Sequence, residues 1–183
     1  MTTYYSTDYQ ESSAGDLMNY ISREGDTPVY DRSGRKMGNQ RKQRFIEKSE
    51  QHQFERHMII SPENGDQLSN DELARETRRT MENFAKDRPS TTFAYTIHRD
   101  TEHPHAHVAM TGEKTDLYMD KQDIDTVREN ANERMVENDR YKYRSRENDR
   151  DRQHDHEQEQ LFDAEQKRRN QETENENEEG LFR

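Results

Sequence analysis

The sequence predicts an α+β fold in which helices flank an antiparallel sheet. In several short segments apolar residues alternate with polar ones, which is the pattern of strands with one buried face. In other segments they recur at the three- and four-residue spacing of an amphipathic helix. Two of the strand segments are joined by a short polar turn, so we expect a hairpin, and the order of the segments predicts helices packed on one face of the sheet.

The first predicted helix occupies SSAGDLMNYISREG, residues 12–25, where a serine can cap the start and Gly25 the end. Tyr20 lies on this helix among apolar residues. The segment FERHMIIS, residues 54–61, then predicts a strand that is closed by the turn PENG.

The clearest predicted helix is SNDELARETRRTMENFAK, residues 69–86. Ser69 and Glu72 have the spacing of a capping box, and the apolar residues that follow keep to one helical face. The segments TTFAYTIH, residues 91–98, and PHAHVAM, residues 104–110, predict the two strands of the hairpin on either side of the polar turn RDTE.

Two further elements are expected before the polar end of the chain. The segment DLYM, residues 116–119, predicts a short edge strand, and Asp120 is placed to cap the helix that follows. The apolar face of that helix is formed by Ile124, Val127, Ala131 and Met135.

The composition changes after residue 137. Residues 138–183 contain few apolar side chains, so they cannot bury enough surface to offset the entropy lost on ordering. We therefore expect one folded domain over residues 1–137 and a disordered or transiently helical charged tail over residues 138–183. Two apolar pairs in the tail are candidate docking motifs for an accessory or coupling protein, with chance hydrophobes as the alternative: Leu161-Phe162 and Leu181-Phe182.

The bulk composition excludes several kinds of site. The absence of cysteine rules out disulfides and thiolate metal sites, so histidine and carboxylates are the only strong metal ligands. The sequence has no apolar run long enough to span a membrane, and its start, MTTYYSTDYQ, does not resemble a secretory signal. We therefore expect a cytoplasmic protein with no membrane partner.

The net charge of −11 argues against nucleic-acid binding, but the charge is unevenly distributed. Between Arg32 and Lys48 seven basic residues stand against one acid, Glu47. Such a stripe can contact phosphates, or it can be an ordinary solvated loop. The candidate phosphate-binding residues are Arg32, Arg35, Lys36, Arg41, Lys42 and Arg44.

Four of the eight histidines lie in one stretch, IHRDTEHPHAHVAM. His105 and His107 are two residues apart on a strand and so project to one face, and the hairpin returns His98 beside His105. Three imidazoles from two neighbouring strands can bind one divalent cation and leave positions open for water or a phosphate oxygen. Asp100 is placed to accept a hydrogen bond from a ligand imidazole, whereas His103 in the turn is the expected bystander.

This stretch resembles the third motif, H-x-D-x4-H-x-H, of the relaxases, which are the conjugation and mobilisation nucleases of the HUH endonuclease superfamily. Two other segments are similar to the family's remaining motifs and follow the same order. In LMNYISREG, Tyr20 has the place of the nucleophilic tyrosine, and in RHMIISPENGD, Ser61 has the place of a serine that holds DNA near the cleavage point. The resemblance covers about residues 14–135, including DLYMDKQDIDTVRE after the histidines.

The resemblance implies a sheet of about five antiparallel strands, with a metal on the sheet and the tyrosine on an adjacent helix. It implies site- and strand-specific nicking and religation of single-stranded DNA at a plasmid or viral origin, through a 5′-phosphotyrosine on Tyr20. It further implies a divalent ion, Mn²⁺ or Mg²⁺, at His98, His105 and His107, and DNA contacts from Ser61 and the basic stripe. Three imidazoles favour Mn²⁺ by affinity.

Two alternatives stay open from the sequence. Rolling-circle replication initiators carry their tyrosine after the histidine motif, where NDRYKYRSR offers Tyr141 and Tyr143. A non-catalytic module would instead bind single-stranded DNA without cleaving it, and Tyr20 would then be an ordinary core aromatic of its helix.

Overall fold

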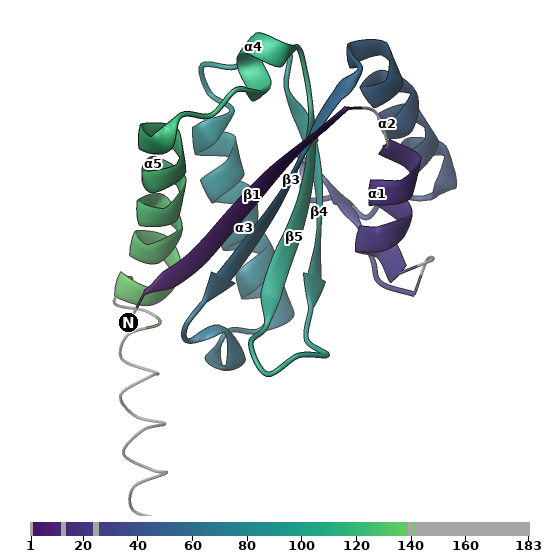
Figure 1. The fold of residues 1–183 in the computed structure, drawn as a ribbon. Helices are drawn as coiled ribbons and strands as arrows, with labels where there is room; N and C mark the ends of the chain where they lie inside the picture. The colour runs from purple at the N-terminus through teal and green to yellow at the C-terminus, as the bar shows by residue number, and fades with distance from the viewer. Residues whose placement is uncertain (1, 12–13, 24–25, 139–140, 142–183) are drawn as a thin grey trace, which may run out of the picture. The chain divides into compact units, whose positions relative to one another are not determined.

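The computed structural model of the chain describes residues 2–11, 14–23, 26–138 and 141 (Figure 1). Their centre is one five-stranded sheet in which all neighbouring strands are antiparallel. The α+β fold with about five antiparallel strands is therefore confirmed. Across the sheet the strands lie in the order β1 (Thr3–Glu11), β3 (Phe54–Pro62), β5 (His105–Thr111), β4 (Thr92–His98) and β2 (Tyr30–Asp31).

Helices cover both faces of the sheet, so the expectation of helices on one face is wrong. Figure 1 shows α1 and α2 on one side of the sheet and α3 and α5 on the other. The reason is that the central strands carry apolar side chains on both faces. The helices are α1 (Ala14–Ser22), α2 (Asn39–His52), α3 (Asn70–Phe84), α4 (Lys114–Leu117) and α5 (Lys121–Asn132), with a 3₁₀ turn η2 (Gly65–Gln67) and a π-helical turn η3 (Glu133–Glu137).

The larger core lies between the sheet and the helices α3 and α5. Met58 of β3, Val108 of β5 and Tyr95 of β4 point into it, and all three are buried. Leu73 of α3 and Val127 of α5 meet them from the helical side. This burial of apolar surface is the main stabilising contribution of the fold.

The smaller core lies on the opposite face and fills only one end of it. Met18 and Ile21 of α1 and Phe45 of α2 pack there against the small residues Ala94 and Ala109 of the sheet. The histidines lie further along the same face, where β4 ends and β5 begins, and α1 reaches them with the Tyr20 ring and the Ile21 carbonyl.

Two capping boxes fix the starts of α3 and α5 where the sequence predicted them. The Ser69 hydroxyl accepts a hydrogen bond from the Glu72 amide at 3.2 Å, and the Glu72 carboxylate accepts one from the Ser69 amide at 2.9 Å. Asp120 and Asp123 make the same reciprocal pair at 2.9 and 3.1 Å.

The predicted edge strand over residues 116–119 is wrong. Residues 114–117 form α4 instead, and the buried Leu117 anchors this short helix in the larger core. The Asp116 carboxylate accepts hydrogen bonds from the amide and the hydroxyl of Ser90, which draws the segment into a turn against the start of β4. The edge strands are β1 and β2, neither of which was predicted from the sequence.

The predictions for the tail lie outside the described residues. The described fold reaches Tyr141, and the domain boundary at residue 137 stays a prediction. Among the helices of the described ranges, none has both the length and the apolar character that crossing a bilayer requires.

Candidate active site

Three histidines meet where β4 ends and β5 begins. His98 is the last residue of β4 and pairs directly with His105, the first residue of β5. His107 lies two residues further along β5, so the alternation of the strand turns it to the same face. Each of the three rings offers a nitrogen atom, and these atoms lie within 4.8 Å of one another. The hairpin thus brings together the three histidines that the sequence singled out.

Backbone carbonyls determine which nitrogen carries the proton in two of these rings. Nε2 of His98 lies 2.9 Å from the carbonyl oxygen of Ile21, and Nδ1 of His105 lies 2.9 Å from that of His103. Because a carbonyl oxygen can only accept, both of these nitrogens carry the proton. The lone pairs of the neutral rings are therefore at Nδ1 of His98 and Nε2 of His105. His103, the expected bystander, contributes its main chain.

The donor set fits a divalent cation. The Nε2 atoms of His105 and His107 are 3.0 Å apart. Two imidazole nitrogens that bind one cation at about 2.1 Å and at right angles are separated by about 3.0 Å. Neutral imidazole is the form that binds metals, and burial, followed by the neighbouring rings of His98 and His105, lowers the pKa of His107 to about 3.

A fourth histidine, His57 on β3, joins the cluster. Its Nε2 lies 2.8 Å from Nδ1 of His107, and the two rings stack at 7° with their centroids 5.0 Å apart. Burial lowers the pKa of His57, and the charge of Asp8, its partner in register on β1, opposes that shift. His57 was not predicted as a site residue, because a single histidine in an apolar strand has no local signal and only the pairing of β3 with β5 brings it to His107.

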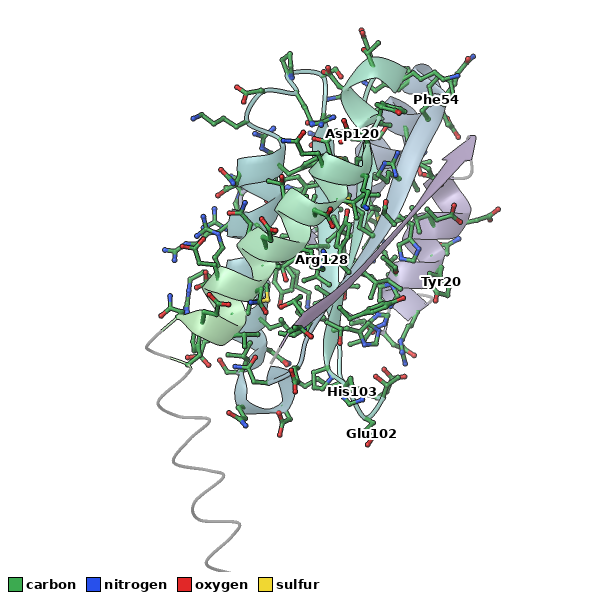
Figure 2. All side chains as sticks on the ribbon, turned by 60° about the vertical axis from the view of Figure 1, so that its left-hand side comes forward. Tyr20, Phe54, Glu102, His103, Asp120 and Arg128 are labelled. Atoms are coloured by element: carbon green, nitrogen blue, oxygen red, sulfur yellow. The ribbon has the colours of Figure 1, made fainter. Side chains whose placement is uncertain are left out.

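Tyr20 projects from α1 over this stacked pair. Its ring stands nearly perpendicular to both imidazoles, with centroid distances of 5.7 Å to His57 and 5.5 Å to His107. The side chain is 60% exposed, so Tyr20 is not a core aromatic. Figure 2 shows it on α1, at the right of the view, with the turn that holds His103 at the lower end of the molecule.

A cavity of about 650 Å³ joins the tyrosine to the histidines. Its position on the sheet surface leaves room for a ligand between the Tyr20 hydroxyl and the three rings. The residues that line it are Asn19, Tyr20, Arg23, Ile59, His98, Thr101, His105 and His107.

A sequence profile of the MobA/VirD2-like relaxase nuclease domain matches residues 20–139, close to two thirds of the chain. The chain belongs to the MobA/VirD2-like relaxases. The relaxase is accordingly a DNA-nicking enzyme that acts on single-stranded DNA. A search of curated proteins found none that matches it.

Asp100 of the relaxase binds an arginine and not a ligand histidine. Its carboxylate forms an ion pair with Arg23, and this partner holds the pKa of Asp100 below its ordinary range. The guanidinium of Arg23 in turn lies 3.4 Å from Nδ1 of His98. The expected contact of Asp100 with an imidazole is thus replaced by one that runs through Arg23, a residue that was not predicted to take part in the site.

Ser61 lies on the histidine face of the sheet, two residues after Ile59, which is paired with His107. Its hydroxyl donates a hydrogen bond to the carbonyl of Pro104 at 3.4 Å. Gly65 packs against the same carbonyl so closely that an added Cβ would lie 2.8 Å from the oxygen. The turn after β3 is thereby held against the turn that precedes His105.

The predicted basic residues lie in the turn that follows β2 and on α2. Figure 1 shows α2 at the end of the sheet opposite the β4–β5 turn. Two of them bind Asp31, whose carboxylate accepts a hydrogen bond from the Arg41 side chain at 3.0 Å and one from the Arg35 main-chain amide at 3.0 Å. Arg32 donates to the Thr91 carbonyl at 3.2 Å. The remaining candidates, Lys36, Lys42 and Arg44, are exposed or half-buried on the same segment.

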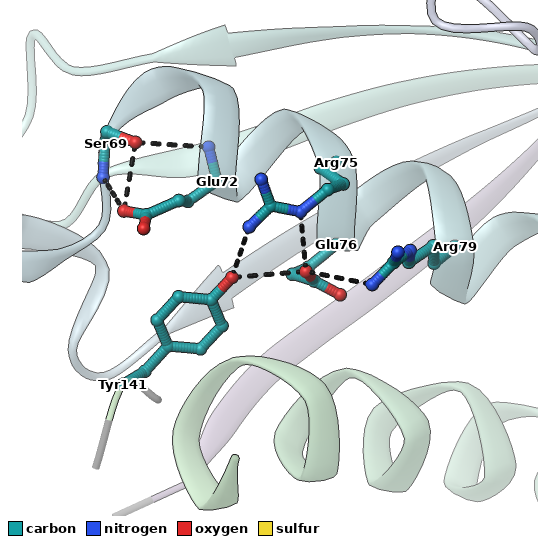
Figure 3. A network of polar contacts seen from close by, with 6 residues as sticks. All are labelled: Ser69, Glu72, Arg75, Glu76, Arg79 and Tyr141. Atoms are coloured by element: carbon teal, nitrogen blue, oxygen red, sulfur yellow. Dashed lines mark hydrogen bonds and ion pairs between the residues drawn. The ribbon is translucent and has the colours of Figure 1, made fainter. Parts of the chain in front are cut away.

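Tyr141 lies in the larger core, on the face of the sheet opposite the histidines. It is 1% exposed, and its hydroxyl accepts from Arg75 at 2.6 Å and donates to Glu76 at 3.2 Å (Figure 3). Burial raises the pKa of Tyr141. The structure does not bring this tyrosine to the candidate metal site, which removes the support for a replication initiator that uses it. Tyr143 lies outside the described residues.

Proposed function

We propose that this relaxase nicks one DNA strand at a specific site and rejoins it, with Tyr20 as the nucleophile, in plasmid mobilisation or conjugative transfer. The supporting observation is the position of Tyr20, whose exposed ring lies over His57 and His107 and lines one cavity with all three candidate ligands. A nucleophile and a charge-stabilising site must lie together in this way for phosphoryl transfer.

The proposed reaction is a transesterification. The Tyr20 oxygen forms a bond to the scissile phosphorus as the bond to the 3′ oxygen breaks, which leaves a 5′-phosphotyrosine and a free 3′-hydroxyl. The phenol loses its proton to solvent, and the departing 3′ oxygen takes one up. Because one phosphodiester replaces another, the reverse step rejoins the strand without a separate source of energy.

His98, His105 and His107 are the residues that would hold a divalent cation, Mn²⁺ or Mg²⁺. When bound there, such an ion would neutralise part of the negative charge on the phosphate. Hydrogen bonds to backbone carbonyls fix the orientation of two of these rings: His98 donates to the carbonyl of Ile21, and His105 donates to that of His103. His57 does the same for His107 and keeps its Nε2 directed at Nε2 of His105.

Other parts of the chain hold the DNA strand in this proposal. Ser61, on the histidine face, contacts the strand near the cleavage point, and the basic residues of α2 and of the turn before it contact phosphates further along. The partner is single-stranded DNA at a plasmid or viral origin, in the cytoplasm. The tail, residues 138–183, recruits an accessory or coupling protein.

The direct test is the covalent adduct. Purified protein, Mn²⁺ and a single-stranded oligonucleotide that spans the mapped nick are expected to give a protein–DNA band that survives denaturation. Tyr20→Phe is expected to abolish this band, whereas Tyr118→Phe, at a tyrosine of matching exposure on another part of the surface, retains it. An undiminished adduct in Tyr20→Phe would overturn the proposal.

A further inference from the structure

Tyr4 of β1 is one of three large apolar side chains that are strongly exposed in the described ranges. It is 63% exposed, compared with 60% for Tyr20 and 64% for Tyr118. Its neighbour Tyr5 points to the opposite face and is buried in the larger core. The strand therefore places one tyrosine inside and presents the other to solvent.

The pairing of the strands puts Tyr4 on the histidine face. Tyr4 pairs directly with Ser61, and both side chains therefore point to the same side of the sheet. The next strand across, β5, carries His105 at the same level, and His105 pairs with His98 of β4. Tyr4 and His105 are thus separated by two strand spacings, about 10 Å.

A cavity of about 830 Å³ opens beside Tyr4 at the start of β1, next to the histidine site. Besides the tyrosine ring, polar side chains line it: the Ser61 hydroxyl, the His103 ring in the β4–β5 turn and the Arg128 guanidinium on α5. Figure 2 labels His103 and Arg128. Glu63 also lines the cavity, and its carboxylate accepts a hydrogen bond from the Thr2 amide at 2.6 Å. An aromatic face with hydrogen-bond donors around it is suited to a nucleotide.

We propose that Tyr4 is a stacking platform for the base of a nucleotide that flanks the scissile phosphate. The inference rests on the proposed nuclease function, because it takes the phosphate to lie at the histidines and Tyr20. The strand then runs across the sheet from the histidines over Ser61 to the cavity at β1. There the His103 ring donates a hydrogen bond to the sugar–phosphate backbone, and the Ser61 hydroxyl exchanges its long contact with the Pro104 carbonyl for one with the DNA. Every base has an aromatic face, so the subsite accepts any of the four.

Binding without cleavage isolates this contact. In a Tyr20→Phe background, the affinity for the fluorescently labelled oligonucleotide that spans the nick is measured by anisotropy. Adding Tyr4→Ala is expected to weaken binding about 5-fold to 150-fold, the effect of losing one stacked base. Tyr4→Phe, which keeps the ring, is expected to restore the affinity. The matched control Tyr118→Ala is expected to bind as the parent does.

Two further measurements separate stacking from a general loss of structure or charge. Tyr4→Ala is expected to leave the salt dependence of binding unchanged, whereas Arg128→Gln reduces its slope if that residue contacts a phosphate. With 2-aminopurine placed in turn at each position flanking the nick, fluorescence is expected to be quenched at one position and recovered there by Tyr4→Ala. Equal affinities for the parent and Tyr4→Ala, or equal losses in Tyr4→Ala and Tyr118→Ala, would overturn the subsite.

Failure of the subsite and failure of the nuclease proposal give different results. If Tyr4→Ala binds normally while the adduct on Tyr20 forms, only the subsite is wrong. If no adduct forms under any condition but binding still depends on the Tyr4 ring, the nuclease proposal fails and the stacking contact stands.

Discussion

His57 and His107 form a stacked, hydrogen-bonded pair, with Nε2 of one 2.8 Å from Nδ1 of the other. The contact directs the second nitrogen of His107 at His105, and Asp8 of β1 supplies a negative charge behind His57. A side chain that orients a metal ligand in this way typically changes metal affinity or activity by about 10- to 100-fold when it is removed.

We therefore expect His57→Ala to bind Mn²⁺ about 10- to 100-fold more weakly than the parent protein, as measured by titration calorimetry. His57→Gln, which can still accept a hydrogen bond from Nδ1 of His107, is expected to recover part of that loss. His52→Ala, at the end of α2, is the matched control. A His57→Ala protein that binds Mn²⁺ as tightly as the control would show that the pair has no role in holding the ion.

Arg23 is expected to oppose cation binding. Its guanidinium lies 3.4 Å from Nδ1 of His98, the nitrogen whose lone pair is available for a metal. Two like charges about 4 Å apart repel by about 1 kcal/mol even in water, so Arg23→Gln is expected to bind Mn²⁺ at least about 5-fold more tightly in the absence of DNA. Arg44→Gln removes the same charge from α2 and is expected to leave the affinity unchanged. Weaker binding by Arg23→Gln would contradict this role.

The metal-free protein is expected to lose stability as the pH falls through the range set by His107. The unfolded chain takes up a proton on this ring near the ordinary pKa of 6.5, whereas the folded protein, with a pKa of about 3, does not. Protons therefore favour the unfolded state below about pH 6.5, and the free energy of unfolding decreases until about pH 3. Urea unfolding in the presence of a chelator, at about pH 7 and at about pH 5, measures the free energy of unfolding at each pH and so gives the decrease between them. In His107→Gln the decrease is expected to be smaller, and equal decreases in the two proteins would exclude His107 as its source.

Tyr141→Phe separates stability from catalysis. The substitution removes the hydroxyl that bridges Arg75 and Glu76 in the buried network of Figure 3. Leaving these groups without that partner is expected to lower the free energy of unfolding by about 1–3 kcal/mol. Adduct formation below the melting temperature is expected to be unchanged. Loss of the adduct in a folded Tyr141→Phe protein would instead make Tyr141 the nucleophile.

Local signals in the sequence were sufficient to predict the helices that begin at Ser69 and Asp120, because a capping box involves only neighbouring residues. The convergence of His98, His105 and His107 could also be predicted, since a short turn fixes the register of a hairpin.

Elements that depend on distant partners could not be predicted in this way. β1 is rich in hydroxyl and charged side chains and becomes a strand because it pairs along its full length with β3. α2 is a helix with few apolar residues, and Phe45 is its buried contact with the smaller core. Asp100 shows the same limit within the site, because its partner Arg23 directly follows α1 and is distant from Asp100 in the sequence.

The place of β5 in the sheet has a consequence for the bound state. β5 is hydrogen-bonded along both edges, to β3 and β4, whereas α1 is a nine-residue helix that rests on a small apolar cluster. In the proposed reaction the cleaved DNA strand is attached to α1 through Tyr20, whereas the three histidines that would hold the ion lie on β4 and β5. The attached DNA can therefore move with the helix without displacing these histidines. Amide hydrogen exchange is expected to report this division of stiffness, with slow exchange in β5 and fast exchange in α1.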